Sequence, residues 1–463
     1  MTNNDMKNKQ YYVGLDIGTT KIVAMIGEKN EFGKIRILGY GQSKSEGINK
    51  GVVHNITKTI QSILQAIKDA QDRTGLIIKD VEVGIAGQHI LSMQHSDYIT
   101  RSNPEQVIDE EDIQKLINQV YSLGMQPGQE IIHVLPQEYK VDGQTEIKEP
   151  IGMEGSRLEA SFHLVIGQMS SIRNIGRCVK SAGLNLVKLT LEPLASAESV
   201  LSEEEKEAGV ALVDIGGGTT DVAIFKDGII RHTAVIPMGG NVITDDIKEG
   251  CAILGKYAEL LKVRFGSAWP GENKENEMVA IPGIKGKEPK EISVKNLSKI
   301  IYARMVNILE AINNVIKNYG HDEQKKKLFA GIVLTGGGSQ LKHIKQLAEY
   351  VTGMDVRIGY PNEHLAGESD ERIASPVYAT SIGLVMSAIK SHEIQKSELF
   401  PIYEDKIEHP VALSETPVEE QPLPQEEDSL FEEEKEKKKY GLLDKMINNS
   451  FVDRLKKMLD SAE

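Results

Sequence analysis

The chain has few cysteines and few aromatic residues. Its 463 residues include only two cysteines, Cys178 and Cys251, which excludes a disulfide framework and a cysteine-based zinc ribbon. We expect both thiols to be reduced and buried. Aromatic residues make up 5% of the chain, hydrophobic residues 40% and charged residues 26%. These values are ordinary for a soluble globular protein, and the length accommodates about three domains of roughly 150 residues.

Basic residues are outnumbered by acidic ones. The chain has 54 Lys and Arg against 68 Asp and Glu, a formal net charge of −14. An acidic protein repels the phosphate backbone of nucleic acids, so we do not expect a nucleic-acid partner.

We expect neither a secretory signal nor a membrane-spanning helix. The first ten residues, MTNNDMKNKQ, lack the apolar core of a signal peptide. The longest stretch without a charge, Ile373 to Ile389, has 17 residues and contains Pro376, whereas a spanning helix needs about 20 mainly apolar residues. We therefore expect the protein to be cytoplasmic.

Composition changes near residue 393. Before it, apolar segments alternate with helical patterns and glycine turns, which is typical of an α/β architecture. Residues 393–439 contain five prolines between Pro401 and Pro424 and an acidic run that ends in lysines. Such a segment buries too little apolar surface to fold, so we predict a disordered linker. Hydrophobic periodicity returns in residues 440–463.

The body of the chain contains an internal repeat. YYVGLDIGTTKIVAMIG near the start recurs a domain's length later as GVALVDIGGGTTDVAIFKDG. In both segments an apolar strand reaches an aspartate, Asp16 or Asp214, followed by a glycine turn with paired threonines and a second strand. Two such hairpins predict two similar α/β halves that face each other across a cleft.

Both turns have the composition of a phosphate-binding loop. Glycine lets successive backbone N–H groups converge on an anion, and threonine hydroxyls and a lysine add donors. Asp16 and Asp214 cannot bind phosphate, but they can hold a hydrated Mg²⁺ that bridges phosphate oxygens. The expected nucleotide-binding residues are Gly18, Thr19, Thr20 and Lys21 in the first turn and Gly216, Gly217, Gly218, Thr219 and Thr220 in the second.

A third glycine turn follows the buried strand in FAGIVLTGGGSQLKHIKQLAEYV. Its residues Gly336, Gly337 and Gly338 allow close approach of the backbone to a flat ring or a phosphate, and Ser339 is expected to cap a following helix. The Walker pattern GxxxxGK[ST] is absent, as is GxGxxG with its downstream acid. This argues against a P-loop enzyme and a Rossmann enzyme.

The three turns, in this order, resemble the motifs of the actin/hexokinase/DnaK-type ATPase superfamily. Asp16–Lys21 is similar to its phosphate-1 motif, Asp214–Asp221 to phosphate-2 and Gly336–Ser339 to the adenosine motif. The resemblance implies an actin-like fold of two similar halves around a cleft that binds ATP and Mg²⁺. It also implies two connecting helices, LTLEPLASAESV from Leu189 and SPVYATSIGLVMSAI from Ser375.

The same resemblance implies roles for three further residues. Glu259 and Lys262 lie three apart on one helical face, and in relatives an equivalent pair contacts the ribose and base of the nucleotide; a surface ion pair is the alternative. Glu192 opens the first connecting helix, where superfamily members position the attacking water, although a glutamate is also favoured there by the helix dipole. We expect a slow ATPase at most.

The segment between the two halves resembles one family within this superfamily. The phrases IHVLPQEYKVDG and PIGMEGSRLEA, in a compact α/β module with a short helix at about 111–123, resemble the inserted subdomain of the FtsA family of actin-like bacterial cell-division proteins, as does IPMGGNVITDDI from Ile236. The resemblance covers about residues 11–390. One departure is the polar insertion WPGENKENEMVAIPGIKGKEP, whose effect on partners the sequence does not predict.

The resemblance implies a division into six parts. The first-half core takes 11–82 and 162–194, with 376–392 packing back near it, the inserted subdomain takes 83–161, the second-half core takes 195–228 and 331–375, the second-half small subdomain takes 229–330, the disordered linker takes 393–439, and an amphipathic helix takes 440–463.

The last segment has the pattern of a membrane-surface helix. One apolar stripe is formed by Leu443, Ile447, Phe451, Leu455 and Met458. Between Lys437 and Leu459 there are seven Lys or Arg and two Asp, a net charge of +5. Such a helix binds an anionic membrane surface. The alternative is a helix that docks on the body or on another protein.

FtsA-family resemblance implies an ATP-binding protein that polymerises head to tail and anchors FtsZ filaments to the cytoplasmic face of the cell membrane at the division site, recruiting later division proteins. The FtsZ C-terminal tail would bind the second-half small subdomain, where Arg304 is a candidate contact for an acidic peptide; an ordinary surface arginine is the alternative. Other candidates are a pilus-assembly ATPase and a small-molecule kinase of the same fold. A DnaK-type chaperone would need a β-rich domain after residue 390, which the linker cannot form.

Overall fold

The computed structural model describes residues 10–396 with gaps at 275, 284–287, 363–364 and 368–370, all within a single compact unit. The predicted membrane stripe, Leu443 to Met458, and nearly all of the predicted linker lie outside the described residues. The expected start of the linker at 393 is wrong, because helix α10 (Ala379–Lys396) continues past it. Glu393 in this helix pairs with Lys29 at 2.6 Å.

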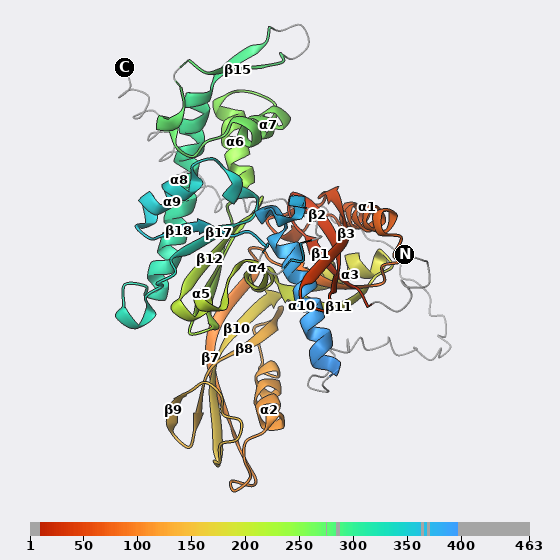
Figure 1. Ribbon diagram of the computed structural model, residues 1–463, viewed down its shortest axis with the longest axis vertical. Helices are drawn as coiled ribbons and strands as arrows, with labels where there is room; N and C mark the ends of the chain where they lie inside the picture. The colour runs from red at the N-terminus through yellow and green to blue at the C-terminus, as the bar shows by residue number, and fades with distance from the viewer. Residues whose placement is uncertain (1–9, 275, 284–287, 363–364, 368–370, 397–463) are drawn as a thin grey trace, which may run out of the picture. The chain divides into compact units, whose positions relative to one another are not determined.

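The first half is built on a five-stranded sheet. Alternate residues of strand β2 (Lys21–Lys29) point to opposite faces of this sheet. Ile22 and Ala24 pack toward helix α1 (Ile56–Thr74), whereas Val23 and Met25 pack toward α10. Helix α3 (Met169–Ser181) packs beside α1, and Figure 1 shows α10 next to β1 and β2. The spatial order is β11 (Asn185–Leu191), β6 (Asp80–Ile85), β1 (Tyr12–Ile17), β2 (Lys21–Lys29) and β3 (Ile35–Lys44), with β6 and β11 parallel to β1.

The second half repeats this strand order. Its first three strands form an antiparallel meander. A fourth strand then pairs parallel with the first strand of the meander, and a fifth pairs parallel with the fourth. The order is β14 (Ile229–Ile236), β13 (Thr220–Lys226), β12 (Val210–Ile215), β17 (Ile332–Thr335) and β18 (Val356–Ile358). The sequence repeat is therefore also a repeat of topology, and the predicted pair of similar α/β halves is confirmed.

The inserted subdomain has its own sheet and core. Helix α2 (Glu110–Tyr121) is capped by Asp109, which accepts from the Asp112 N–H, close to the predicted helix at 111–123. Phe162 and Leu116 are fully buried between sheet and helix. The sheet order is β7 (Ile90–Thr100), β10 (Arg157–Gln168), β8 (Gln129–Val141) and β9 (Gln144–Ile147).

Three expected domain boundaries are wrong. Two of them fall inside a strand, and the third falls at the first residue of a strand that belongs to the neighbouring sheet. Residue 83 lies inside β6 of the first-half sheet, and residue 161 lies inside β10, which pairs with β7 and β8 over its whole length. Residue 229 begins β14, which belongs to the second-half sheet. Each of these strands runs without a break, so no turn signal marks the change of subdomain.

The second-half small subdomain is mainly helical. Its long helix α8 (Val294–Tyr319) is capped by Ser293, whose hydroxyl accepts from the Asn296 N–H, and buries Met305, Ile308 and Ile312. The polar insertion contributes β15 (Met278–Ile281), which pairs antiparallel with β16 (Lys290–Ser293) directly after the insertion. Helices α6 (Gly240–Gly250) and α7 (Gly255–Phe265) pack together beside α8.

Two helices connect the halves. Helix α4 (Glu192–Val200) begins at Glu192 rather than at Leu189, because residues 189–191 belong to β11. Helix α10 follows the 3₁₀ turn η6 (Pro376–Tyr378). The two helices cross in close contact, because a Cβ placed on Gly383 would lie 1.8 Å from the carbonyl oxygen of Ala195.

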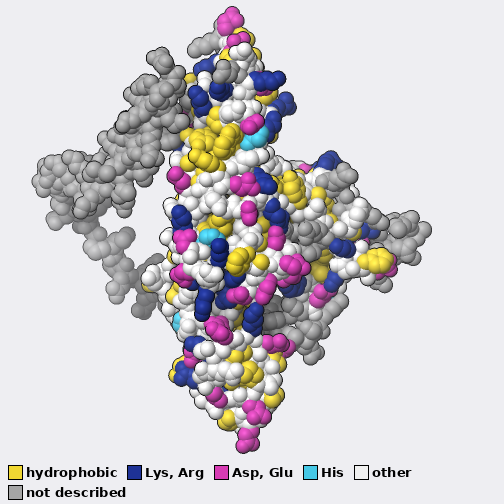
Figure 2. Space-filling view, turned by 60° about the vertical axis from the view of Figure 1, so that its left-hand side comes forward, with side chains coloured by type: hydrophobic (Ala, Val, Ile, Leu, Met, Phe, Trp, Pro, Cys, Tyr) yellow, Lys and Arg dark blue, Asp and Glu magenta, His cyan; other side chains and the backbone are white. Residues whose placement is uncertain are grey.

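The remaining elements are short. They are β4 (Ile48–Asn49), β5 (Val52–Val53), α5 (Glu203–Ala208), α9 (Ile344–Thr352), η2 (Pro270–Glu272), η3 (Gln324–Lys326), η4 (Gly337–Gln340) and η5 (Glu371–Ala374). Cys178 and Cys251 are free and buried, as predicted. Within the described part of the chain, no helix combines the length and the apolar character needed to span a bilayer. On the face in Figure 2, Lys and Arg are interspersed with Asp and Glu, and a hydrophobic patch gathers in its upper part.

Candidate functional site

The glycine turns of the two halves lie against each other. A Cβ placed on Gly217 would lie 2.4 Å from Cγ2 of Thr20, and one on Gly218 would lie 2.7 Å from Oγ1 of Thr19. The missing side chains therefore allow the β1–β2 turn and the β12–β13 turn to approach closely. The structure brings together the residues that the sequence predicted from each half.

The two aspartates at the strand ends are held by hydroxyl groups. Asp16 is 6% exposed and accepts a hydrogen bond from Ser381 Oγ at 3.0 Å. Oδ2 of Asp214 accepts from Ser196 Oγ and Thr380 Oγ1, both at 3.1 Å. Both carboxyl groups have pKa values raised chiefly by burial, although the hydroxyls lower them. The hydroxyls come from the crossing helices α4 and α10.

Lys21 lies among these carboxylates. Its Nζ donates to the carbonyl oxygen of Val377 at 2.5 Å and lies 4.4 Å from the ring centroid of Tyr378. Burial lowers the pKa of Lys21, and the charges of Asp16, Asp214 and Glu192 raise it. The site therefore combines one buried ammonium with several acids, which suits the charge pattern of a metal-bound phosphate.

Glu192 faces the same group of acids from the start of α4. Burial raises its pKa well above the usual value, the charges of Asp16, Asp221 and Asp214 raise it further, and Lys21 opposes them. A Cβ on Gly84 would lie 3.2 Å from Oε1 of Glu192, so the adjoining strand leaves room for this side chain. The position agrees with the predicted role, which remains a prediction.

Asp221, the last residue of the predicted phosphate-2 motif, also belongs to the site, although the sequence predicts no binding role for it. Burial and the charge of Asp214 raise its pKa to about 7, against the lowering effect of the Thr219 hydroxyl, which donates to Oδ2 at 2.9 Å. Its Oδ1 is buried without a hydrogen-bond partner among the described residues. Aligned on their paired threonines, the two repeats place Asp221 at the position of Lys21, and in the structure Asp221 pairs with Asp214 where Val23 pairs with Asp16.

The donor set fits Mg²⁺ held jointly by protein and phosphate. Within the described residues, no group of three or more His, Cys, Asp or Glu side chains could hold a metal by itself. Mg²⁺ is usually bound by one or two carboxylates together with substrate phosphates and water. Asp16, Asp214 and the unpartnered Oδ1 of Asp221 supply oxygen ligands of this kind.

The predicted pair Glu259 and Lys262 forms an ion pair of 2.7 Å close to the second turn. Lys262 Nζ also donates to the Gly240 carbonyl oxygen at 2.9 Å. The Gly240 N–H in turn donates to the carbonyl oxygen of Gly216 at 2.9 Å. The pair therefore lies at the amino end of α6, which is hydrogen-bonded to the second glycine turn. Its contact with a ribose or base remains a prediction.

The third turn meets Asp214, but it does not lead directly into a helix. Gly336 has φ 78°, and a Cβ there would lie 2.1 Å from Oδ1 of Asp214, whereas a Cβ on Gly337 would meet nothing within 4 Å. The expected helix cap at Ser339 is wrong. Its hydroxyl donates to the Gly336 carbonyl oxygen at 2.7 Å inside η4, and α9 begins only after His343.

Arg304 lies in an internal ion pair. Its Nε and Nη2 donate to the two carboxylate oxygens of Asp246 on α6 at 2.5 and 2.9 Å. This pairing raises the pKa of the guanidinium. An acidic partner would therefore share or replace Asp246.

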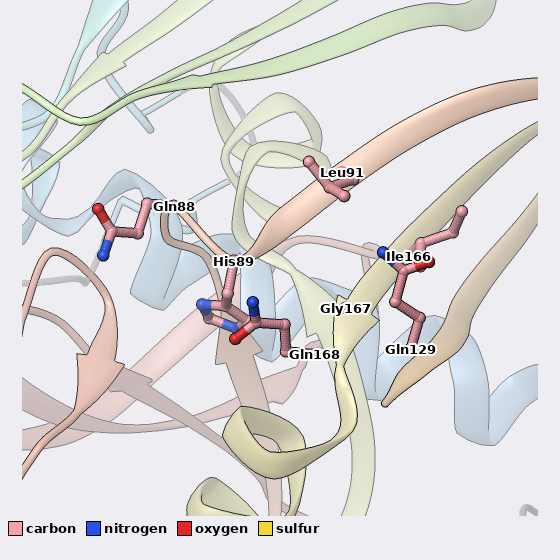
Figure 3. Close-up of a pocket in the computed structure, with 7 residues that line it drawn as sticks. All are labelled: Gln88, His89, Leu91, Gln129, Ile166, Gly167 and Gln168. Atoms are coloured by element: carbon pink, nitrogen blue, oxygen red, sulfur yellow. The ribbon is translucent and has the colours of Figure 1, made fainter. Parts of the chain in front are cut away.

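A second feature is a cavity of about 90 Å³ at the root of the inserted subdomain (Figure 3). It is lined by Gln88, His89, Leu91, Gln129, Ile166, Gly167 and Gln168. His89 is 5% exposed, and neither ring nitrogen has a hydrogen-bond partner among the described residues. Burial lowers the pKa of this ring to about 4, so it is neutral near pH 7.

Two halves of equal strand order, joined by crossing helices and meeting at two aspartate-bearing turns, define the actin-like ATPase fold. A chain in the structure titled "PilM-PilN type IV pilus biogenesis complex" superposes with a TM-score of 0.60 at 14% identity, covering 82% of this chain and 98% of that chain. This likeness concerns the fold alone.

Sequence comparisons identify the family. The family model "Cell division protein FtsA" matches residues 211–383, and "SHS2 domain inserted in FTSA" matches residues 87–166. Cell division protein FtsA of Pseudomonas aeruginosa is 39% identical over 378 residues, 82% of this chain and 89% of that protein. The Escherichia coli K12 protein of the same description is 34% identical over 389 residues, 83% and 92% of the two chains. The chain belongs to the FtsA family of cell division proteins.

Proposed function

We propose that this protein binds ATP with Mg²⁺, polymerises head to tail and anchors FtsZ filaments to the cytoplasmic face of the cell membrane at the division site. The observation that carries the nucleotide part is the meeting of the two repeated turns around Asp16, Asp214 and Lys21. FtsA-family membership supports the cell-division part. Recruitment of later division proteins is part of the same proposal.

Residues of all three turns would hold the nucleotide. Backbone N–H groups of Gly216 to Gly218 and the hydroxyls of Thr19 and Thr20 would donate to phosphate oxygens, and Lys21 would bind a terminal phosphate. Asp16 and Asp214 would hold Mg²⁺, which neutralises phosphate charge when bound. The ribose and base would lie toward Glu259 and Lys262, with Gly336 to Ser339 along the adenosine.

Glu192 would orient a water molecule toward the terminal phosphate if ATP is hydrolysed. Burial, and after it the charges of the surrounding acids, raises its pKa, and a carboxyl group in such a setting can hydrogen-bond a water molecule and share its proton. Bound ATP would be hydrolysed slowly at most.

The membrane and filament contacts would lie at separate places. The apolar stripe from Leu443 to Met458, with the cationic residues around it, would bind an anionic lipid surface. The FtsZ C-terminal tail would bind near Arg304, in competition with Asp246 for the guanidinium. A head-to-tail contact between copies of this chain would extend into a filament.

Binding of a fluorescent peptide with the FtsZ tail sequence tests the partner. We expect Arg304→Gln to weaken the peptide tenfold or more, about 1.4 kcal/mol or greater, because the acidic peptide loses a charged donor. Asp246→Asn is the matched variant, since it removes the internal competitor for the guanidinium and should keep or raise affinity. Equal losses in both variants, or no peptide binding by the unmodified protein, contradict this part of the proposal.

A further inference from the structure

Three hydroxyl groups on the connecting helices hold the two aspartates of the site. Thr380 and Ser381 are neighbours in the first turn of α10, yet Thr380 donates to Asp214 of the second half and Ser381 donates to Asp16 of the first half. Ser196 on α4 donates to the same oxygen of Asp214, and its hydroxyl lies 2.9 Å from that of Thr380. One helical turn therefore bridges carboxylates from both halves.

The three hydrogen bonds fix which oxygen of each carboxylate remains for a ligand. Ser381 donates to Oδ2 of Asp16, and the other two hydroxyls donate to Oδ2 of Asp214. In both carboxylates Oδ1 receives none of these bonds. Ser196 and Ser381 are fully buried, and Thr380 is 8% exposed. A hydroxyl donates to a carboxylate without neutralising it, so the negative charge needed by a cation is kept while rotation of the carboxylate is restricted.

We infer that Ser196, Thr380 and Ser381 are positioning residues that orient Asp16 and Asp214 for Mg²⁺ and link the metal site to the crossing of α4 and α10. This inference rests on the proposed ATP and Mg²⁺ binding and adds the residues that prepare the site. Since α10 is bonded to an aspartate of each half, a rotation of one half about the crossing alters the hydrogen bonds on both carboxylates. Binding of Mg²⁺ is thus coupled, through the three hydroxyls, to the orientation of one half relative to the other.

Ser199 provides a matched control in the same place. It is buried in α4, and its hydroxyl donates to the carbonyl oxygens of Ala379 at 2.7 Å and of Ser196 at 3.0 Å. It therefore joins the same two helices without touching a carboxylate. Loss of helix packing alone would affect Ser199→Ala and the positioning variants alike.

The test is calorimetric titration of the full-length protein with ATP, in a series of Mg²⁺ concentrations and in EDTA. Thr380→Val keeps the shape of the side chain and removes the donor. We expect it to weaken Mg²⁺-dependent ATP affinity about tenfold, to leave the affinity in EDTA unchanged and to be rescued by Thr380→Ser. Ser196→Ala and Ser381→Ala should act in the same direction, and Ser199→Ala should match the unmodified protein.

The outcomes separate the inference from the function on which it rests. If the unmodified protein binds no ATP, the proposed function is contradicted. If it binds ATP with Mg²⁺ and the three positioning variants behave like Ser199→Ala, only the positioning role is overturned. A loss in Thr380→Val that is equal with and without Mg²⁺ also overturns that role, because it reports general damage to the cleft. Ser381→Ala and Ser196→Ala keep the test decisive if Thr380→Val does not fold.

Discussion

Asp221 lies directly opposite Asp214 in the antiparallel register of β12 and β13. The first hairpin has Val23 at the equivalent place opposite Asp16. The two halves of the fold are therefore alike in topology and different in charge, with two acids contributed by the second hairpin and one by the first. This asymmetry gives the site an oxygen, Oδ1 of Asp221, that is buried without a partner among the described residues.

Substitution of Glu192 should separate ATP binding from turnover. If ATP is hydrolysed, Glu192→Gln should slow phosphate release by about 10²–10⁴-fold, because water positioning contributes on that order. ATP affinity should not fall, since glutamine keeps the size of the side chain and adds no charge beside Asp16 and Asp214. Glu198→Gln on the same helix is the control, because Glu198 pairs with Lys206 and Lys390 away from these acids. Normal turnover in Glu192→Gln would remove the predicted role.

The carboxyl-terminal stripe should bind membranes through its apolar residues. On the predicted helix, Phe451 and Leu455 would lie one turn apart at the centre of the stripe, and each large apolar side chain buried in a membrane surface contributes about 1.5–3 kcal/mol. Attraction by charge alone is screened over about 8 Å at physiological salt. Phe451→Glu with Leu455→Glu should therefore abolish co-sedimentation with anionic vesicles and leave ATP binding intact.

Two observations complete the membrane test. Truncation before Gly441 should give the same loss as the double variant, and replacement of exposed Asp72 on α1 should have no effect. A double variant that still sediments with anionic vesicles at high salt would show that the body carries its own lipid site. The carboxyl-terminal segment would then be a docking peptide for a protein partner.

Acid should destabilise the contact between the inserted subdomain and β14. His163 is 1% exposed, accepts from the Gln94 amide at Nδ1 and donates from Nε2 to Thr233 on β14 at 3.0 Å. Burial, with a smaller effect from His232, lowers its pKa to about 4 from 6.5. As pH falls, this histidine therefore takes up a proton in the unfolded chain before it does so in the folded protein. The free energy of unfolding falls as pH drops from 6.5 to about 4, by about 1.4 kcal/mol per pH unit for one such ring.

Thermal melts over this pH range test the histidine. His163→Gln, which cannot titrate, should show a shallower loss of Tm with acid than the unmodified protein. The slope should not vanish, because burial also lowers the pKa values of His89 and His133 to about 4. His54→Gln, at an exposed position, should keep the full slope. Parallel curves for His163→Gln and the unmodified protein would contradict this account.

Local repeats make the fold and the two aspartate-bearing glycine turns predictable. The strand–aspartate–glycine pattern recurs within short segments, so Asp16 and Asp214 were found from sequence and lie together as expected. The expected helix cap at Ser339 is wrong because its hydroxyl donates to the Gly336 carbonyl oxygen three residues earlier, a local bond of the glycine turn.

The hydroxyls of the connecting helices could not have been predicted from local pattern. Ser381 reaches Asp16 across 365 positions of the chain, and Thr380 reaches Asp214 across 166. Serine and threonine in an apolar helix give no signal of such distant partners. The same holds for the boundaries of the inserted subdomain, because β10 continues through residue 161, where only its register with β8 shifts.

Calorimetric titration of ATP into the unmodified protein and Asp214→Ala is the most direct test of the central claim, that the two repeated turns form one ATP and Mg²⁺ site. The account predicts Mg²⁺-dependent binding by the unmodified protein and an affinity at least tenfold weaker in Asp214→Ala, a difference of about 1.4 kcal/mol or more. Asp72→Ala, an exposed aspartate of α1, should bind as the unmodified protein does. Unchanged affinity in Asp214→Ala would contradict the assignment of the metal site to the meeting point of the two halves.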